Sequence, residues 1–241
     1  MAGHGRTAFA LLSTVAVTAW SVYDVMQFGA VGDGVTSDTA AIRAALEAAR
    51  VAGGATVVLP SGYTFLSGSV NVSSNTELRV EGTFLASPTT TLGDYVLVPP
   101  LPWYGGGQDA QESGAPEWIS VIRSFNTVNV SIRGGGTIDG NGGAADGWWA
   151  CFHATPALGP PPCAGYSRPQ LVRFVHAVAV VVENVTLVNS PAWTLHIANV
   201  TNARIRNLRV LAPADQGNTD GVDIDCSQDV VVSGMYYAGA L

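Results

Sequence analysis

The sequence predicts an all-β fold, a right-handed parallel β-helix with one helix that caps its N-terminal end. The composition favours strands and turns, because glycine and β-branched residues are plentiful while charged residues are scarce. After Ala55, short apolar runs broken by Gly, Asn, Ser and Pro replace the helical period. A loose internal repeat, built of these short runs, occupies the C-terminal part of the chain.

The composition bounds the size of the fold and the class of partner. The chain has 241 residues, 47% of them hydrophobic and 12% charged, so we expect one large domain with a substantial core and no disorder. The formal net charge is −7, and all 11 basic residues are arginines. Because phosphate binding needs a clustered positive field, we expect no nucleic-acid partner. An anionic substrate would need arginines placed locally.

The N-terminus resembles a secretory leader. Arg6 precedes an apolar run from Ala8 to Ala19, which ends in small residues typical of a cleavage site. We therefore expect residues 1–20 to be a signal peptide and 21–241 to be an incomplete β-helix domain. A buried N-terminal strand is the alternative. No other stretch approaches the roughly 18 apolar residues of a membrane helix, so we expect no membrane span.

A strand over Tyr23–Phe28 and a Gly/Asp turn are expected to precede the capping helix. Four apolar residues of that helix fall on one face at helical spacing: Ile42, Ala45, Leu46 and Ala49. Ser37 or Asp38 can cap its start, and Gly53-Gly54 its end. Because a stack of coils exposes an apolar end with unpaired backbone groups, this helix is expected to cover that end.

The internal repeat predicts the solenoid. Three stretches each contain a strand, a corner and a second strand, with corners at Asn184, Asn207 and Gly234, which are 23 and 27 residues apart. Each unit of this length buries its apolar face only by stacking on its neighbours. The segments 101–114 and 140–168 are then long loops, which in a solenoid project from one face and wall a cleft.

Sequons and cysteines fit an oxidising, secretory route. Four Asn-x-Ser/Thr triplets predict N-glycosylation, at Asn71, Asn129, Asn184 and Asn199. Cys151 and Cys163 flank a loop and are expected to form a disulfide, which leaves Cys226 without a partner. Cys151, His153 and Cys163 match no familiar zinc spacing, so we expect no metal site and no cofactor.

An acidic cluster lies in "GNTDGVDIDCSQD", residues 217–229. If "GVDIDC" is a strand, Val222 and Ile224 point inward and the alternating carboxylates point outward. Gly221 lets the backbone aim the preceding carboxylate separately. The three clustered carboxylates are those of Asp220, Asp223 and Asp225. Such a group suits general acid or base work on a glycosidic bond, calcium binding, or a solvated acidic strand.

Several motifs resemble glycoside hydrolase family 28, the polygalacturonases, and in particular its plant-type branch. The supporting stretches, in family order, are "FGAVGDGVTSDTAAI", "GGATVVLPSG", "GTIDGNG", "RPQLV", "NSPAW", "LAP" and "NTDGVDID". The likeness covers roughly Tyr23 to Tyr237. The opening motif is shared by several β-helix families, whereas "NTDG" following "NSPAW" is specific.

The resemblance implies a function and a role for each acidic residue. It implies a secreted, monomeric enzyme of the extracellular space or cell wall that hydrolyses α-1,4-galacturonosyl bonds of pectin or polygalacturonate with inversion. Asp220 matches the family aspartate that holds and activates the attacking water. Asn218 matches the asparagine that shapes the site, and Asp223 and Asp225 match acidic positions that line the cleft.

The chain departs from the family pattern after Asp220. The family's later "GDD", "GHG" and "RIK" motifs are absent, so we expect a C-terminally truncated chain with little or no hydrolytic activity. Two alternatives remain open. One is a calcium-dependent pectate lyase-like β-helix, with Asp220, Asp223 and Asp225 as calcium ligands and an arginine as base. The other is a non-catalytic pectin-binding pseudoenzyme.

Overall fold

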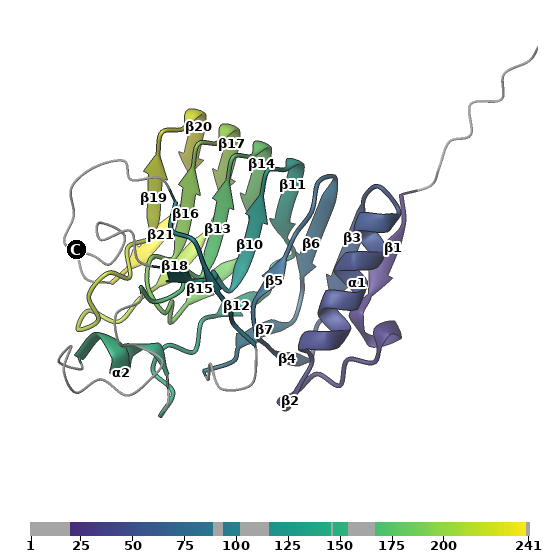
Figure 1. Ribbon diagram of the computed structural model, residues 1–241, viewed down its shortest axis with the longest axis horizontal. Helices are drawn as coiled ribbons and strands as arrows, with labels where there is room; N and C mark the ends of the chain where they lie inside the picture. Colours follow the sequence, from purple (N-terminus) through teal and green to yellow (C-terminus); the bar gives the residue numbers. More distant parts are fainter. Residues whose placement is uncertain (1–19, 89–93, 102–115, 146, 154–166, 240–241) are drawn as a thin grey trace, which may run out of the picture.

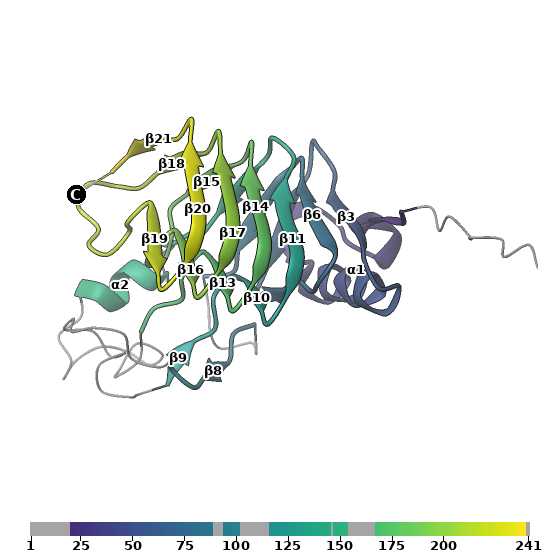
Figure 2. The same ribbon diagram turned by 90° about the horizontal axis from the view of Figure 1, so that it is seen from above.

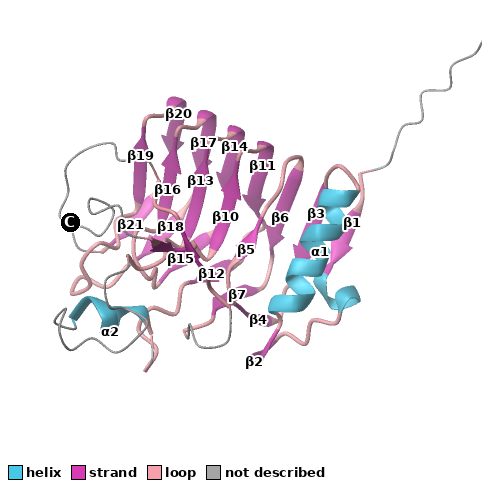
Figure 3. Ribbon diagram, viewed as in Figure 1, coloured by secondary structure: helices cyan, strands magenta, loops and turns pink. Residues whose placement is uncertain are grey.

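The computed structural model is a stack of coils whose strands form three parallel sheets (Figure 1). The coils wind as a right-handed parallel β-helix, so the predicted fold class is confirmed. Strands make up most of the regular structure (Figure 3). The structure describes residues 20–88, 94–101, 116–145, 147–153 and 167–239.

The three sheets run along the length of the stack. Sheet A contains, in spatial order, β1 (Val22–Asp24), β3 (Ala55–Leu59), β6 (Thr76–Val80), β11 (Val128–Arg133), β14 (Val178–Glu183), β17 (Thr201–Arg206) and β20 (Gln228–Ser233). Sheet B contains β2 (Asp33–Ser37), β4 (Thr64–Ser67), β7 (Thr83–Ala86), β12 (Thr137–Asp139), β15 (Thr186–Val188), β18 (Arg209–Leu211) and β21 (Tyr236–Ala238). Sheet C contains β5 (Val70–Asn71), β10 (Ile122–Phe125), β13 (Val172–Val175), β16 (Leu195–Ala198) and β19 (Val222–Asp225).

The corners between sheets A and B lie where the sequence places them. Asn184, Asn207 and Gly234 have φ of 56°, 52° and 62°, a left-handed conformation that asparagine and glycine tolerate. The side-chain amide of Asn207 donates to Oδ1 of Asn184 at 3.2 Å, so successive corners are also linked by side chains. At Gly234 the left-handed conformation suits glycine, because it has no Cβ to strain. The predicted corners are confirmed.

Helix α1 (Thr39–Val51) lies across the N-terminal end of the stack, as expected (Figure 1). The four residues of its predicted apolar face are buried against the first coils: Ile42, Ala45, Leu46 and Ala49. Asp38 is the N-cap residue, but its carboxylate accepts from the backbone N–H groups of Val31 and Gly32 at 2.6 and 3.1 Å. It therefore anchors the preceding turn and makes no side-chain cap. Gly53 and Gly54 end the helix with bonds from their N–H groups to its last turn.

The strand expected over Tyr23–Phe28 is correct at its start and wrong after Asp24. Strand β1 ends at Asp24, and Val25–Phe28 form a 3₁₀ helix, η1. The Asp24 carboxylate accepts from the N–H of Met26 at 2.9 Å, and Gly29 closes the turn with φ of 92°. This local cap favours a tight turn over a continued strand.

A short hairpin and a second helix lie beside the stack on the side of sheet C (Figure 2). Strands β8 (Leu97–Val98) and β9 (Glu117–Trp118) pair antiparallel, and α2 spans Trp148–His153 within one expected loop. Trp148 is buried between the rings of Tyr95 and Trp118, with centroids 5.4 and 5.8 Å away. Aromatic packing therefore joins α2 to the hairpin.

The expected signal peptide and most of the expected loop 101–114 fall on residues outside this description. The expected signal peptide lies almost wholly in residues 1–19, and the division of the chain at residue 20 stays a prediction. None of the described helices is both long and apolar enough to cross a membrane.

The core consists of apolar columns that run along the interior of the stack. The column of sheet B has 0% exposure throughout and comprises Phe65, Phe84, Ile138, Leu187 and Val210. Each member contacts the coils on both sides, because the strands stack in register. The fold therefore depends on the inward side chains of successive coils.

Replacing one member of this column should destabilise the chain strongly. Leu187→Ala removes a fully buried side chain between two coils and is expected to lower the free energy of unfolding by about 3 kcal/mol. Val188→Ala, on the outward side of the same strand, is the control and should change it by less than about 1 kcal/mol. Denaturant unfolding of both variants checks this. An equal loss of stability in the two variants would contradict the inward position of Leu187.

Candidate active site

The outer face of sheet C carries a column of polar side chains. Register pairs Arg123 with Arg173, Arg173 with His196 and His196 with Asp223, one from each of β10, β13, β16 and β19. The residues that alternate with these along each strand point inward. They include Ile122, Val172 and Leu195, which are buried. Because side chains alternate across a strand, every second residue of sheet C reaches the outer face.

The alternation expected for β19 is confirmed by its register. Val222 and Ile224 pair with the buried Leu195 and Ile197 of β16, so they belong to the inward columns. Ile224 is nevertheless 47% exposed, contrary to the expectation of an interior residue. Strand β19 is the edge strand of sheet C, and in the described part of the chain no strand stacks on its other side.

The loop before β19 holds Asp220 through its backbone. The N–H of Thr194 donates to the Asp220 carbonyl at 2.8 Å, and the Thr194 hydroxyl donates to the Thr219 carbonyl at 3.3 Å. The side chain of Asp220 is left exposed. The backbone of Asn218 has a left-handed conformation, with φ of 57°, so this residue forms the turn that leads into this segment. The carboxylate therefore projects from a fixed backbone.

Buried Arg168 clamps the same loop. Its guanidinium donates to the carbonyls of Pro191 at 2.7 Å and Gly217 at 2.8 Å. The Thr219 hydroxyl donates to the Gln216 carbonyl at 2.9 Å. A planar guanidinium that bridges two carbonyls ties the loop at 217 to the loop after β15. The "RPQLV" motif marked this arginine, but the sequence did not indicate that it binds backbone.

Asp223 lies half-buried beside two other carboxylates. Burial, together with the charges of Asp220 and Asp225, raises its pKa to about 7. Its Oδ2 atom is buried and has no hydrogen-bond partner among the described residues. A protonated carboxyl is the form that this environment favours, since an unpaired buried charge is costly.

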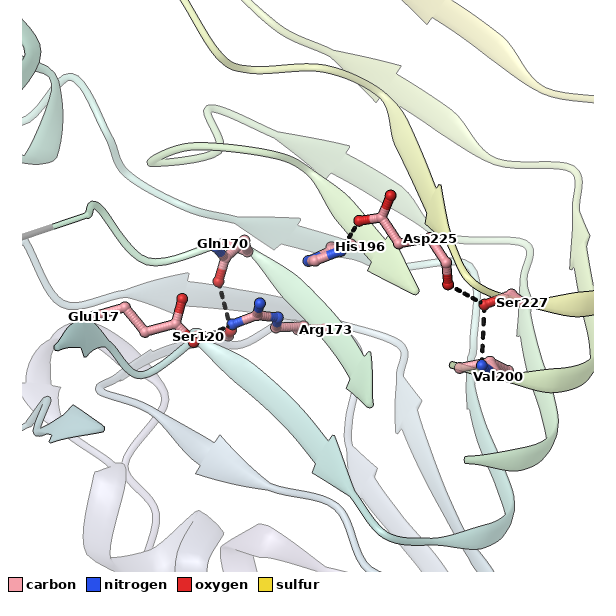
Figure 4. A network of polar contacts seen from close by, with 8 residues as sticks. All are labelled: Glu117, Ser120, Gln170, Arg173, His196, Val200, Asp225 and Ser227. Atoms are coloured by element: carbon pink, nitrogen blue, oxygen red, sulfur yellow. Dashed lines mark hydrogen bonds and ion pairs between the residues drawn. The ribbon is translucent and has the colours of Figure 1, made fainter. Parts of the chain in front are cut away.

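Asp225 is held by a neutral histidine. Nε2 of His196 lies 2.7 Å from Oδ2 of Asp225, and the imidazole is fully buried (Figure 4). Burial and the nearby charge of Arg173 lower the pKa of His196 to about 4, and these effects outweigh the raising effect of Asp225. The neutral ring therefore donates its Nε2–H to the carboxylate. The Ser227 hydroxyl, which donates to the Asp225 carbonyl at 2.8 Å, fixes the turn after β19.

A buried ion pair underlies the middle of the face. Arg173 pairs with Glu117 of β9 (Figure 4), and both side chains are at most 3% exposed. Ser120 beside them donates to Oε1 of Gln170 at 2.9 Å. Sequence analysis missed this pair. The isolated arginine in "LVRFV" was the available signal, but its partner lies 56 residues away, in the short strand β9.

The remaining predicted residues lie away from this cluster or outside the description. The four sequon asparagines are exposed, which glycosylation requires, and their modification stays a prediction: Asn71, Asn129, Asn184 and Asn199. The side chains of Cys151 and Cys163 lie outside the described part, so the disulfide also stays a prediction. Cys226 is exposed and free. In the described ranges no three His, Cys, Asp or Glu side chains gather as metal ligands.

Comparison with known proteins identifies the family. The family model described as "Glycosyl hydrolases family 28" matches residues 52–238. The chain belongs to this family. A protein named "Probable polygalacturonase" from Vitis vinifera is 32% identical over 216 residues, which are 88% of this chain and 41% of that relative. A probable polygalacturonase of Arabidopsis thaliana is 30% identical over 227 residues, 93% of this chain and 42% of that relative.

Solved structures agree on the fold. An exopolygalacturonase from Thermotoga maritima has a TM-score of 0.74 and 24% identity, and the match covers 91% of this chain and 52% of that one. A polygalacturonase from Erwinia carotovora has a TM-score of 0.68 and 22% identity, covering 95% and 58%. At such identities the likeness bears on the fold alone. The chain spans roughly two fifths to three fifths of the lengths of these relatives.

The raised pKa of Asp223 predicts a specific pH dependence of stability. Between pH 3.8, the ordinary pKa of an aspartate, and about pH 7, the folded chain keeps a proton on Asp223 that the unfolded chain releases. The stability that the neutral Asp223 contributes is therefore lost as pH rises through 7. When pH rises from about 5 to about 8, the free energy of unfolding of Asp223→Asn should therefore increase relative to that of the parent by about 1–2 kcal/mol, allowing for solvent screening.

Chemical denaturation at both pH values measures this change. Asp229→Asn, at an exposed position of β20, is the matched control and should show no such gain. A stability difference between Asp223→Asn and the parent that is the same at both pH values would show that Asp223 is not held in its neutral form.

Proposed function

We propose that this chain forms the catalytic face of a hydrolase that cleaves the α-1,4-galacturonosyl bonds of pectin with inversion. The observation that carries the proposal is the exposed Asp220 carboxylate, fixed by backbone bonds at the end of the polar face of sheet C. The names of the Vitis vinifera and Arabidopsis thaliana relatives support polygalacturonan as the substrate.

Asp220 acts as the general base in this proposal. An exposed carboxylate can accept a proton from a water molecule that attacks the anomeric carbon, because water and substrate can reach it. Its neighbour Asp223, whose pKa is raised to about 7, is neutral below that pH. In this proposal, Asp225, which His196 orients, and the loop residue Asn218 contact the substrate beside Asp220.

The inverting reaction also needs a general acid across the scissile bond, far enough away to leave room for water. The resemblance assigns that role to an acidic pair that follows the "NTD" motif, and no acidic residue follows Asp229 in this sequence. We therefore predict that the 241-residue chain hydrolyses polygalacturonate slowly or not at all. Hydrolysis and binding are measured together to check this.

Secretion, action in the extracellular space or cell wall, glycosylation and a monomeric state complete the proposal. The leader-like N-terminus and the four exposed sequons support the route. The substrate also lies outside the cell when it is cell-wall pectin. No cofactor takes part in the proposed chemistry.

The proposal is tested by binding and by hydrolysis of polygalacturonate with a calcium chelator present. The protein is expected to bind polygalacturonate and to release few or no reducing ends; substantial release that Asp220→Asn lowers by about 100-fold or more would show that these residues are sufficient for hydrolysis. Asp215→Asn, at another exposed aspartate of the same loop, is the control and should leave release unchanged. Calorimetry and a reducing-end assay measure the two effects.

The outcomes separate the alternatives. A calcium requirement with an unsaturated, ultraviolet-absorbing product would identify a lyase. Binding without any release of reducing ends would make the chain a pectin-binding protein only. Equal hydrolysis by the parent and Asp220→Asn would remove Asp220 from its role.

A further inference from the structure

Arg123 occupies the outer face of sheet C at the end far from Asp220. It lies on β10, and its register partners are Asn71 of β5 and Arg173 of β13. Strands β13 and β16 separate β10 from β19. With neighbouring strands about 4.8 Å apart, Arg123 lies roughly 14 Å along the face from the strand that follows Asp220.

The charge of Arg123 is not neutralised by the described residues. Arg173 has its own carboxylate partner in Glu117, whereas the guanidinium of Arg123 makes no hydrogen bond or ion pair in the described ranges. Burial lowers the pKa of Arg123 and the charge of Arg173 lowers it further, yet an arginine stays charged. Two arginines beside one glutamate therefore leave a net positive charge on this part of the face.

The use of arginine elsewhere makes this charge unusual. Four arginines bind acidic side chains at the surface, namely Arg50, Arg79, Arg133 and Arg206. Three others bind backbone carbonyls, namely Arg43, Arg168 and Arg204. Within the described part of the chain, Arg123 and Arg209 alone have neither kind of partner, and Arg209 lies on sheet B.

The surroundings of Arg123 hold its half-buried side chain in place. Its Cζ atom lies 4.7 Å from the ring centroid of Phe125, which is 42% exposed. The ring of Phe125 is braced edge-on by His176, with centroids 5.8 Å apart. Asn71 and Phe125 also line a hollow of about 610 Å³ between α1 and the corner of sheets C and A. The guanidinium is thus oriented by a ring beside a concave surface.

We infer that Arg123, oriented by Phe125 and flanked by Asn71, binds a carboxylate of a uronate polymer at a point remote from Asp220. A planar guanidinium can bind a carboxylate through two parallel hydrogen bonds, and an esterified carboxyl offers no charge for it. The inference rests on the proposed function and deepens it. It assigns to the protein a subsite that selects long polygalacturonate chains with free carboxylates. A short oligomer bound at Asp220 cannot reach Arg123.

The test compares two variants that lose the same charge and the same type of ring contact. Arg123→Gln is the test variant. Arg209→Gln is the matched control, because Arg209 lies over the ring of Tyr236 at 4.9 Å but on sheet B. A glycan on Asn71 would cover the site, so the subsite requires an unmodified Asn71, and the protein is produced without N-glycans. Calorimetry gives the affinity for digalacturonate, a long oligogalacturonate and its methyl ester.

Arg123→Gln is expected to weaken binding of the long oligogalacturonate by about 5- to 10-fold, the loss of one partly exposed charge-assisted contact. Binding of digalacturonate and of the methyl ester should change less than about twofold, and Arg209→Gln should have no effect. Far-ultraviolet circular dichroism and the unfolding midpoint confirm that both variants fold.

Three results would overturn the inference. If the parent binds the long oligogalacturonate and Arg123→Gln binds it equally well, the subsite is wrong while the proposed function stands. Equal weakening by Arg209→Gln would show a general charge effect. If the parent binds no uronate of any length, the proposed function fails and the subsite fails with it.

Discussion

Parallel, in-register stacking of successive coils is the constraint on which the structure depends. Each inward side chain contacts its counterparts on the coils before and after, so columns such as Phe84, Ile138 and Leu187 are fully buried although each strand is short. The same register determines what lies outside. One outward position per strand is repeated along the face, which places residues distant in sequence in one row.

The row on sheet C shows how such a face can hold charge. Arg173 is compensated by Glu117, and His196 stays neutral while it donates to Asp225. Asp223 has no such compensation, and burial beside two carboxylates favours its protonated form. Because these side chains are held by stacked strands, their positions are set before any ligand arrives. The strand at the edge of the sheet, β19, therefore carries a fixed acidic group beside a clamped loop.

Local signals predicted much of this arrangement. The helical period gave the buried face of α1, the corners at Asn184 and Asn207 followed from repeat and turn chemistry, and the alternation in "GVDID" placed Asp223 and Asp225 outward. Long-range partners were not predictable in this way. The use of Asp38 to anchor an earlier turn, and the pairing of Arg173 with Glu117 of β9, depend on contacts that only the fold brings together. Register shows which residues share a row, but sequence does not show which of them are paired.

The central claim is that the outer face of sheet C, with Asp220 at one end, is where a uronate polymer lies. A crystal structure of the protein with a long oligogalacturonate tests this most directly. The account predicts a saccharide that extends over the outer side of sheet C, from a sugar ring beside the exposed Asp220 carboxylate toward the half-buried Arg123. A saccharide bound across the outer face of sheet A or sheet B, with Asp220 in contact with solvent only, would contradict it.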